Sequence, residues 1–275
     1  MDTVEASEER VYALWDHLAD GPPELIDQAL DYTLGQLCSI FAAEDACWSG
    51  VVRLSGRADP LCVIERSDPL HGWRPCAIHP LRRDGALVRA FTAGVARRKR
   101  RGAELDVTTI RHAALAGSFR AHRLCDLVPE TWFAAEFYRT VYLEQGVGDA
   151  VYVSVPVGPD CESYIVLMRG VSAPRFSVRE RDAIGRALRG LKWFHRRILL
   201  SHGLLIASAP LTVAERKVLR ELLAGKADKE IAASLARSIH TTREHVASLY
   251  RKFGVSSRAA LLALWLGRNE ASQPA

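Results

Sequence analysis

The sequence lacks the features of several large classes of protein. Its longest uncharged apolar runs fall far short of the roughly 18 residues that a membrane-spanning helix needs. The first residues are acidic and carry no apolar segment, so we expect no secretory signal. Six of the 275 residues are cysteine and none form a C-x-x-C pair, which favours free thiols in a reducing cytoplasm. P-loop, G-x-S-x-G and G-x-G-x-x-G motifs are also missing, so we expect neither enzymatic activity nor a cofactor.

Positive charge is concentrated toward the C-terminal end. The whole chain has a net charge of +5. Residues 210–270 contain eleven Lys and Arg against six Asp and Glu, so this segment carries the entire excess. A length of 275 residues with 48% hydrophobic and 25% charged residues is typical of a soluble protein with two domains. A basic module attached to a neutral one indicates binding to a polyanion, with chance variation on a solvated surface as the alternative.

The first 200 residues carry both helical and strand patterns. Apolar spacing predicts helices over residues 8–18, 22–43, 84–99, 130–143 and 177–201, the fourth of which is rich in aromatic residues and ends at Gly146. Strands are predicted over 48–54, 61–65, 150–157 and 161–171, and a proline-rich loop over 68–80. Because the strands follow one another through turns, we expect an α+β domain, with an antiparallel sheet covered by helices.

Four short helices are predicted after residue 210. Thr212 and Glu215 form a capping box that starts the first of them. The second spans 229–235, Ser238 caps the third, and Ser256 opens the fourth. A short helix, a tight turn and a longer helix are together typical of a helix-turn-helix.

Four motifs lie in fixed order along these helices. They are L-T-x-x-E-R-x-V-L from Leu211, K-E-I-A-x-x-L from Lys229, T-x-R-x-H-V from Thr241 and K-F-G-V-x-S-R from Lys252. In this order and spacing the segment resembles the LuxR/FixJ-type DNA-binding domain. The resemblance implies an all-α four-helix domain over 210–270, after a linker over 201–209 and before a tail over 271–275. Residues 1–200 then form the other domain.

The resemblance also implies which residues bind partners. The helix from Ser238 to Phe253 would enter the major groove of double-stranded DNA, where Arg243 would bind guanine or hold a phosphate. The residues expected to contact DNA are Lys229, Ser238, His240, Thr241, Thr242, Arg243, Glu244, His245 and Lys252. Members of the family pair through the last helix, which implies a homodimer, and RNA polymerase is a further implied partner. The expected dimer face comprises Ala259, Leu262, Ala263 and Leu266, with core burial as the alternative for Leu262.

Three positions depart from the family pattern. Thr242 stands where the family usually has an aliphatic residue. Glu244 occupies a position that is often neutral, and Ala247 occupies one that is often basic. Glu244 would repel phosphate or accept a hydrogen bond from cytosine N4, unless it is a charge on a solvated face. These departures leave open a protein-interaction adaptor with a helix-turn-helix that does not bind DNA.

The N-terminal domain lacks the acidic pocket and phosphoacceptor aspartate of a receiver domain. Asp68-Pro69 followed by Trp73 is only a partial match to acyl-homoserine-lactone sensors. The segment 137–191, with its hairpin and its F-S-x-x-E-R-D motif from Phe176, resembles the GAF-like (PAS-related) region of some LuxR-type regulators. Such folds hold a ligand between the sheet and its covering helices. The candidate cavity residues are Trp48, Trp73, Trp132, Phe133, Phe137 and Tyr152, with plain core packing as the alternative.

Two further clusters of residues are candidates for binding. His71, Cys76 and His79 lack the paired spacing of a metal site, so we expect no metal. The basic run 97–101 is either an anion contact or a solvated helix end. We therefore expect a cytoplasmic transcription regulator without membrane contact, in which a small-molecule effector or partner changes how a dimeric helix-turn-helix is presented. The helix over 177–201 would act as the lever. A ligand-independent regulator whose N-terminal domain only dimerises is the alternative.

Overall fold

The computed structural model describes residues 3–54, 68–98, 106–207 and 209–266, with no account of the side chains of 3–7 and 94–98. The chain divides into two compact units, one made of Met1–Ala19 and Leu30–Lys192, the other of Asp20–Ala29 and Trp193–Ala275. This division differs from the predicted boundary at residue 200, because residues 193–200 and a short N-terminal segment group with the C-terminal helices. The strand predicted over 61–65 and the tail over 271–275 lie outside the described residues.

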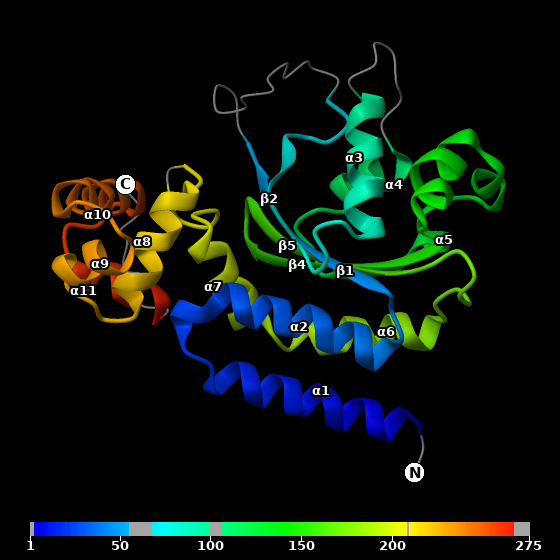
Figure 1. Ribbon diagram of the computed structural model, residues 1–275. Coiled ribbons are helices and arrows are strands. Elements are labelled where there is room, and N and C mark those ends of the chain that lie inside the picture. Colours follow the sequence, from blue (N-terminus) through cyan, green and yellow to red (C-terminus); the bar gives the residue numbers. More distant parts are fainter. Residues whose placement is uncertain (1–2, 55–67, 99–105, 208, 267–275) are drawn as a thin grey trace. The chain divides into compact units, whose positions relative to one another are not determined.

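The first unit contains a five-stranded antiparallel sheet in the order β2-β1-β5-β4-β3 (Figure 1). Its strands are β1 (Asp45–Arg53), β2 (Trp73–Pro80), β3 (Arg120–Arg123), β4 (Asp149–Gly158) and β5 (Cys161–Arg169). The predicted hairpin of β4 and β5 is confirmed, with Gly158 paired to Cys161 across the turn. The predicted α+β class with an antiparallel sheet is also confirmed.

Strand β2 corrects the second part of the loop predicted over residues 68–80, while residues 68–72 form a turn as expected. It lies at the edge of the sheet and pairs only with β1 in the described part of the chain. The pairing register shifts between Gly50 and Val51, so that Cys76 is an extra residue beside Pro75. Proline cannot donate to a ladder and is therefore tolerated at edges and bulges. The prolines of this segment mark an edge strand rather than the absence of a strand.

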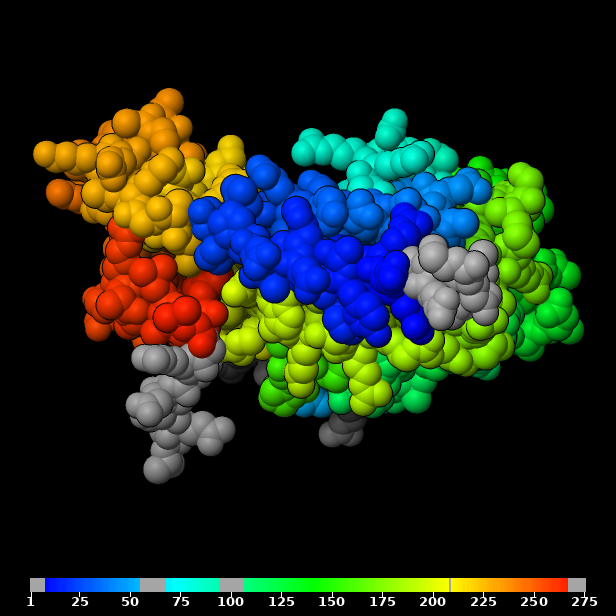
Figure 2. Space-filling model, turned by 90° about the horizontal axis from the view of Figure 1, so that it is seen from below, coloured from blue at the N-terminus to red at the C-terminus, as the bar shows by residue number. Residues whose placement is uncertain are grey.

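Helices cover both faces of the sheet. One face carries α1 (Thr3–Asp20), α2 (Ile26–Phe41, after the 3-10 turn η1, Pro23–Leu25) and α6 (Val178–Arg189), with α1 flanked by the other two in Figure 2. The opposite face carries α3 (Ala86–Arg98) and α4 (Val107–Ala114) (Figure 1). Trp48, Val153 and Ile165 are cross-strand neighbours and fully buried on the α2 and α6 side, so the main core lies there.

The aromatic helix predicted over 130–143 is a series of short turns. After α5 (Leu124–Leu127) come the 3-10 turn η3 (Glu130–Ala134), the π-helical turn η4 (Tyr138–Tyr142) and the 3-10 turn η5 (Leu143–Gln145). Extended backbone at Ala135 separates the first two, while the rings of Trp132, Tyr138 and Tyr142 pack together. Packing of these rings outweighs helical regularity. The predicted end at Gly146 is correct, since its φ is +90°.

The predicted long helix over 177–201 is two helices, α6 and α7 (Lys192–Ser201). The capping box of Ser177 and Glu180 starts α6 as predicted. The interruption lies at Gly190, where a Cβ would come within 2.5 Å of the Trp15 indole. Glycine is a poor helix former, and here only glycine leaves room for the indole. The prediction of one continuous helix over 177–201 is therefore wrong.

The second unit contains the four predicted C-terminal helices, α8 (Val213–Leu223), α9 (Asp228–Ser234), α10 (Ile239–Phe253) and α11 (Arg258–Trp265). The Thr212–Glu215 capping box and the Ser238 cap form as predicted, while Ser257 rather than Ser256 caps α11. The helices enclose one apolar core, which includes Val218, Leu219, Leu222, Ile231, Leu249, Phe253 and Leu261. The predicted all-α four-helix fold is confirmed.

Candidate DNA-binding surface and ligand cavity

One face of α10 is exposed along its whole length. His240, Arg243, Glu244, Ala247 and Arg251 all lie on this face, at spacings of three and four residues. The opposite face of the same helix is buried in the core of the unit. The amphipathic pattern of α10 thus fixes which side chains it presents to solvent.

Arg243 is an accessible basic candidate for a contact with DNA. Its side chain is 67% exposed, and its Nε lies 3.6 Å from a carboxylate oxygen of Asp228 on α9. An exposed pair at this distance contributes little free energy, so Arg243 is free to exchange Asp228 for a phosphate or a base. Glu244 lies on the same face and pairs with His240 at 3.4 Å, also in solvent.

A second basic side chain, Arg237, stands in the turn before α10. Its guanidinium donates a hydrogen bond of 2.9 Å to Nε2 of His245. This bond orients the imidazole of a predicted contact residue. Neither Arg237 nor Arg251 was among the predicted contacts, although the helical spacing from Arg243 would have included Arg251.

Two of the residues expected to contact DNA have partners inside the unit. Thr242 is fully buried, and its hydroxyl donates to the Ser238 carbonyl at 3.0 Å, so it packs in the core and cannot reach DNA. The Lys252 side chain is 18% exposed, and its ammonium lies 2.7 Å from Glu215 and 3.0 Å from the Pro210 carbonyl. Its charge ties α10 to the start of α8. Among the other predicted residues, Lys229 and Ser238 are exposed and Thr241 is half-buried.

The predicted dimer face on α11 is accessible. Leu266 is 76% exposed and Ala259 is also exposed, whereas Leu262 and Ala263 are half-buried. The neighbouring Leu261 and Leu264 point into the core instead. Helix α11 therefore has one apolar stripe inside the unit and a second one open to a partner.

The first unit holds a cavity of about 300 Å³ beside the face of the sheet that carries α3 and α4. Three of the six aromatic residues expected around a cavity, Trp73, Phe137 and Tyr152, line it. Trp132 and Phe133 pack against the neighbouring apolar cluster instead. Trp48 does not line it, because Trp48 is buried on the opposite face, where its Nε1 donates to Ser163 at 2.7 Å.

One end of this cavity is polar. The Asp106 carboxylate caps α4 by accepting from the Thr108 amide at 3.0 Å, and it also accepts from the hydroxyls of Thr108 at 2.7 Å and Tyr142 at 2.9 Å. The Tyr142 and Tyr152 hydroxyls lie 3.4 Å apart. Burial raises the pKa of both phenols well above the ordinary value of 10.0, so both stay uncharged.

His112 lines the same cavity from α4. Its ring centroid lies 5.0 Å from that of Tyr152 and 5.6 Å from that of Tyr164. Burial, with the charges of Arg120 and His122, lowers the pKa of His112 to about 3, so the imidazole is neutral. Among the described residues, neither ring nitrogen has a hydrogen-bond partner.

A buried ion pair lies behind His112. Arg120 of β3 and Glu162 of β5 are 4% and 0% exposed and form two parallel hydrogen bonds of 2.9 and 2.8 Å. The same guanidinium donates to the backbone carbonyl of His112 at 3.0 Å and also bonds the Tyr164 hydroxyl. The ion pair thereby fixes the position of His112. Sequence patterns give no signal for this group, because its members come from separate segments.

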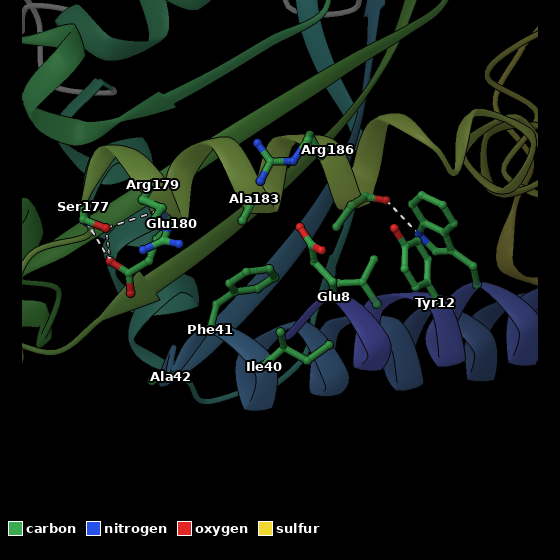
Figure 3. Close-up of a pocket in the computed structure, with 13 residues that line it drawn as sticks. Glu8, Tyr12, Ile40, Phe41, Ala42, Ser177, Arg179, Glu180, Ala183 and Arg186 are labelled. Carbon is green, nitrogen blue, oxygen red and sulfur yellow. Dashed lines mark hydrogen bonds between the residues drawn. The ribbon is translucent and has the colours of Figure 1, made fainter. Parts of the chain in front are cut away.

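A second cavity, of about 450 Å³, lies between α1, the end of α2 and α6 (Figure 3). Its walls are mainly apolar, from Val11, Phe41 and Ala183, and Glu8 of α1 and Arg186 of α6 lie on opposite sides of it. The Trp15 indole donates to the Ala187 carbonyl at 3.0 Å and closes one end. None of the described polar side chains lining it is both buried and unpaired.

The metal candidates are not brought together. Within the described ranges, no group of three or more His, Cys, Asp or Glu is placed to hold a metal ion. His79 lies 2.7 Å from Asp31 instead. The side chains of the basic run 97–101 lie outside the described residues. None of the described helices combines the length and the apolar character needed to cross a membrane.

Residues 209–264 match the sequence family described as GerE, "Bacterial regulatory proteins, luxR family". The C-terminal unit thus contains a LuxR-type helix-turn-helix domain. The match covers α8 to α11 almost completely, including the exposed face of α10. No curated protein sequence matches the chain.

Solved structures resemble the chain at low sequence identity. SdiA in complex with octanoyl-rac-glycerol is 11% identical, with a TM-score of 0.45 over 97% of this chain and 95% of that one. Escherichia coli SdiA is 13% identical, with a TM-score of 0.41 over 94% and 95%. The VqsR LBD domain from Pseudomonas aeruginosa is 16% identical, with a TM-score of 0.41 over 71% and 97%.

Proposed function

We propose that this chain is a DNA-binding transcription regulator in which the N-terminal unit binds a small molecule and controls a dimeric LuxR-type domain. The observation that carries the proposal is the exposed face of α10, which lies within the residues that match the luxR family. A helix of this kind fits the major groove of B-DNA. Its base-reading side chain is Arg243, whose neighbour Asp228 holds it only weakly.

The remaining contacts divide by chemistry. Lys229, Arg237 and Arg251 are exposed basic side chains on or beside α10 that bind phosphates and fix the register of the helix. Glu244 accepts a hydrogen bond from the exocyclic amine of cytosine, which would specify one base pair. Lys252 acts from inside the domain by holding α10 against α8.

To test this proposal, genomic DNA fragments are incubated with the purified chain, and the retained fragments are sequenced. The same experiment is done with the Arg243→Ala variant. We expect a two-fold-related motif with the wild-type chain and its loss with the variant. Arg139→Ala is the matched control, because it removes an equally exposed arginine from the other unit. Affinity should fall steeply as salt rises, since phosphate contacts release counterions.

A protein-interaction adaptor is the second candidate, and it is favoured by the acidic Glu244 on the exposed face of α10. An adaptor would retain no specific DNA sequence, and its affinity for DNA would not depend steeply on salt. The Arg243→Ala substitution would not change the retained DNA. DNA binding by a fragment of residues 205–275 distinguishes the adaptor from a regulator that its N-terminal unit inhibits. The inhibited regulator would gain DNA binding when that unit is removed, and the adaptor would not.

The proposal of ligand sensing rests on the cavity beside the sheet. Octanoyl-rac-glycerol is an uncharged amphiphile, suited to a mainly apolar lining, and is the first compound to test. Binding should raise the melting temperature of the chain, because a ligand that binds only the folded state stabilises it. A chain that dimerises and binds DNA without any compound would be a ligand-independent regulator. Cytoplasmic location and contact with RNA polymerase are part of the same proposal.

A further inference from the structure

His112 is a buried polar group without a hydrogen-bond partner in the described part of the chain. The side chain is 7% exposed and lines the 300 Å³ cavity, yet neither nitrogen finds a partner among the described residues. Native proteins pair almost all of their buried polar groups, so an exception inside a cavity indicates a partner that enters the cavity. A neutral imidazole offers one N–H donor and one acceptor nitrogen.

The walls around His112 favour an uncharged partner. The described residues that line the cavity include no Lys or Arg, so an anion would find no positive charge there. The one described carboxylate on the lining, that of Asp106, already accepts three hydrogen bonds from Thr108 and Tyr142. These three neutral donors occupy most of the acceptor sites of the carboxylate, and a cation would compete with them for the same oxygens. The rest of the lining is apolar or aromatic, which suits a ring or an alkyl chain.

We propose that the cavity binds an uncharged molecule with an aromatic or alkyl body and one hydroxyl, carbonyl or amide group, and that His112 hydrogen-bonds this group. This assignment rests on the proposed sensing function of the N-terminal unit. It makes His112 the residue that distinguishes a ligand from a plain hydrocarbon of the same shape.

The imidazole is held in place before any ligand arrives. Tyr152 and Tyr164 flank its ring, and Arg120 fixes the backbone carbonyl of the same residue. A polar group on a ligand then meets a partner that loses little conformational freedom on binding.

The test uses three probes that share a 4-butylphenyl body and differ in one substituent: 4-butylphenol with a hydroxyl, 4-butyltoluene with a methyl group, and the 4-butylbenzoate anion with a carboxylate. Calorimetric titration into the full-length wild-type chain at pH 7 should rank the phenol first, the hydrocarbon second and the benzoate last. In His112→Phe the affinity for the phenol should fall roughly fivefold to tenfold, to that of the hydrocarbon, as expected for one lost hydrogen bond. His112→Gln should recover part of the loss, because an amide also donates and accepts.

His122→Phe is the matched control, since its ring lies 6.0 Å from that of His112 but does not line the cavity. Binding of the phenol should be unchanged in this variant. In the absence of probe, His112→Phe should melt above the wild-type chain, because it removes an unpaired polar group. If His112→Phe fails to fold, His112→Gln decides the role of the residue.

Different failures point to different errors. An unchanged affinity for the phenol in His112→Phe, or equal wild-type affinities for phenol and hydrocarbon, would overturn the role of His112 and leave ligand sensing in place. Tighter binding of the benzoate than of the phenol would overturn the uncharged class. Binding of none of the three probes would refute the cavity as a ligand site, and with it the sensing half of the proposed function.

Discussion

Replacing Glu162 by glutamine should strongly destabilise the N-terminal unit. The wild-type carboxylate is fully buried and accepts hydrogen bonds from Arg120, from the Gly117 amide at 2.6 Å and from the Ser154 hydroxyl at 3.0 Å. Glutamine keeps the shape of the side chain but removes the charge and turns one acceptor into a donor. The buried guanidinium of Arg120 is then left without a countercharge.

The expected loss follows from the burial of both partners. Removing one member of a buried ion pair costs about 3–5 kcal/mol, because the other charge stays buried and unpaired. A domain has only about 5–15 kcal/mol of stability in total, so the loss is a large fraction of it. Arg53 and Asp160 form a comparable pair at 2.5 Å, but their side chains are 50% and 53% exposed. Arg53→Gln should therefore cost less than about 1 kcal/mol.

Urea unfolding of the full chain measures this difference. The transition of the LuxR-type domain should stay in place and serves as an internal reference, because Glu162 belongs to the other unit. The double variant Arg120→Met with Glu162→Leu removes both charges and should recover much of the lost stability. The reasoning would be refuted if the N-terminal unit of Glu162→Gln unfolded at the same urea concentration as that of Arg53→Gln. In that case the loss of the Glu162 charge would not leave a costly unpaired charge on Arg120.

Three further predictions concern the C-terminal unit. Burial alone would raise the pKa of Glu215, but hydrogen bonds from Lys252, Thr212 and Ser248 lower this pKa from 4.5 to about 2. The ionised Glu215 therefore stabilises the folded unit fully above about pH 4.5, and this contribution is lost as the pH falls toward 2. Acid titration of unfolding should show this dependence in the wild-type chain and a flatter curve in Glu215→Gln. Thr242→Val should leave DNA affinity unchanged and alter stability by less than about 1 kcal/mol, because the hydroxyl bonds only a helix carbonyl; a large loss of DNA affinity would restore Thr242 as a contact. Leu266→Asp should leave the melting temperature unchanged but weaken any dimer in sedimentation equilibrium, because this exposed leucine lies on the predicted pairing face.

The sequence predicts best where a local rule sets the structure. The capping boxes at Ser177 and Thr212 and the cap at Ser238 each form as expected, because the side chain and the amide that it binds lie within three residues. The hairpin of β4 and β5 is equally local. In the C-terminal unit nearly every element is of this kind, so both its fold and its exposed helix face follow from the pattern of residues.

The wrong predictions share a different cause. The edge strand β2 depends on pairing with β1, the interruption at Gly190 depends on Trp15, and the burial of Thr242 depends on how α10 packs into its unit. Each is decided by a partner that is distant in the sequence, and propensity yields to such contacts. The same holds for Trp48, whose aromatic character suits a cavity wall and a core equally well.

The polar group around His112 is the clearest case of a site that sequence reasoning cannot find. His112 stands on a short helix, Arg120 on a four-residue strand that was not predicted, and Glu162 within an apolar hairpin strand. Each alone resembles an ordinary surface residue in the sequence, because charged and imidazole side chains are mostly exposed. Together they are buried, and the ion pair that joins β3 to β5 also holds the His112 backbone at the cavity. Loss of Glu162 should therefore weaken binding of 4-butylphenol as well as stability, even under conditions where the unit remains folded.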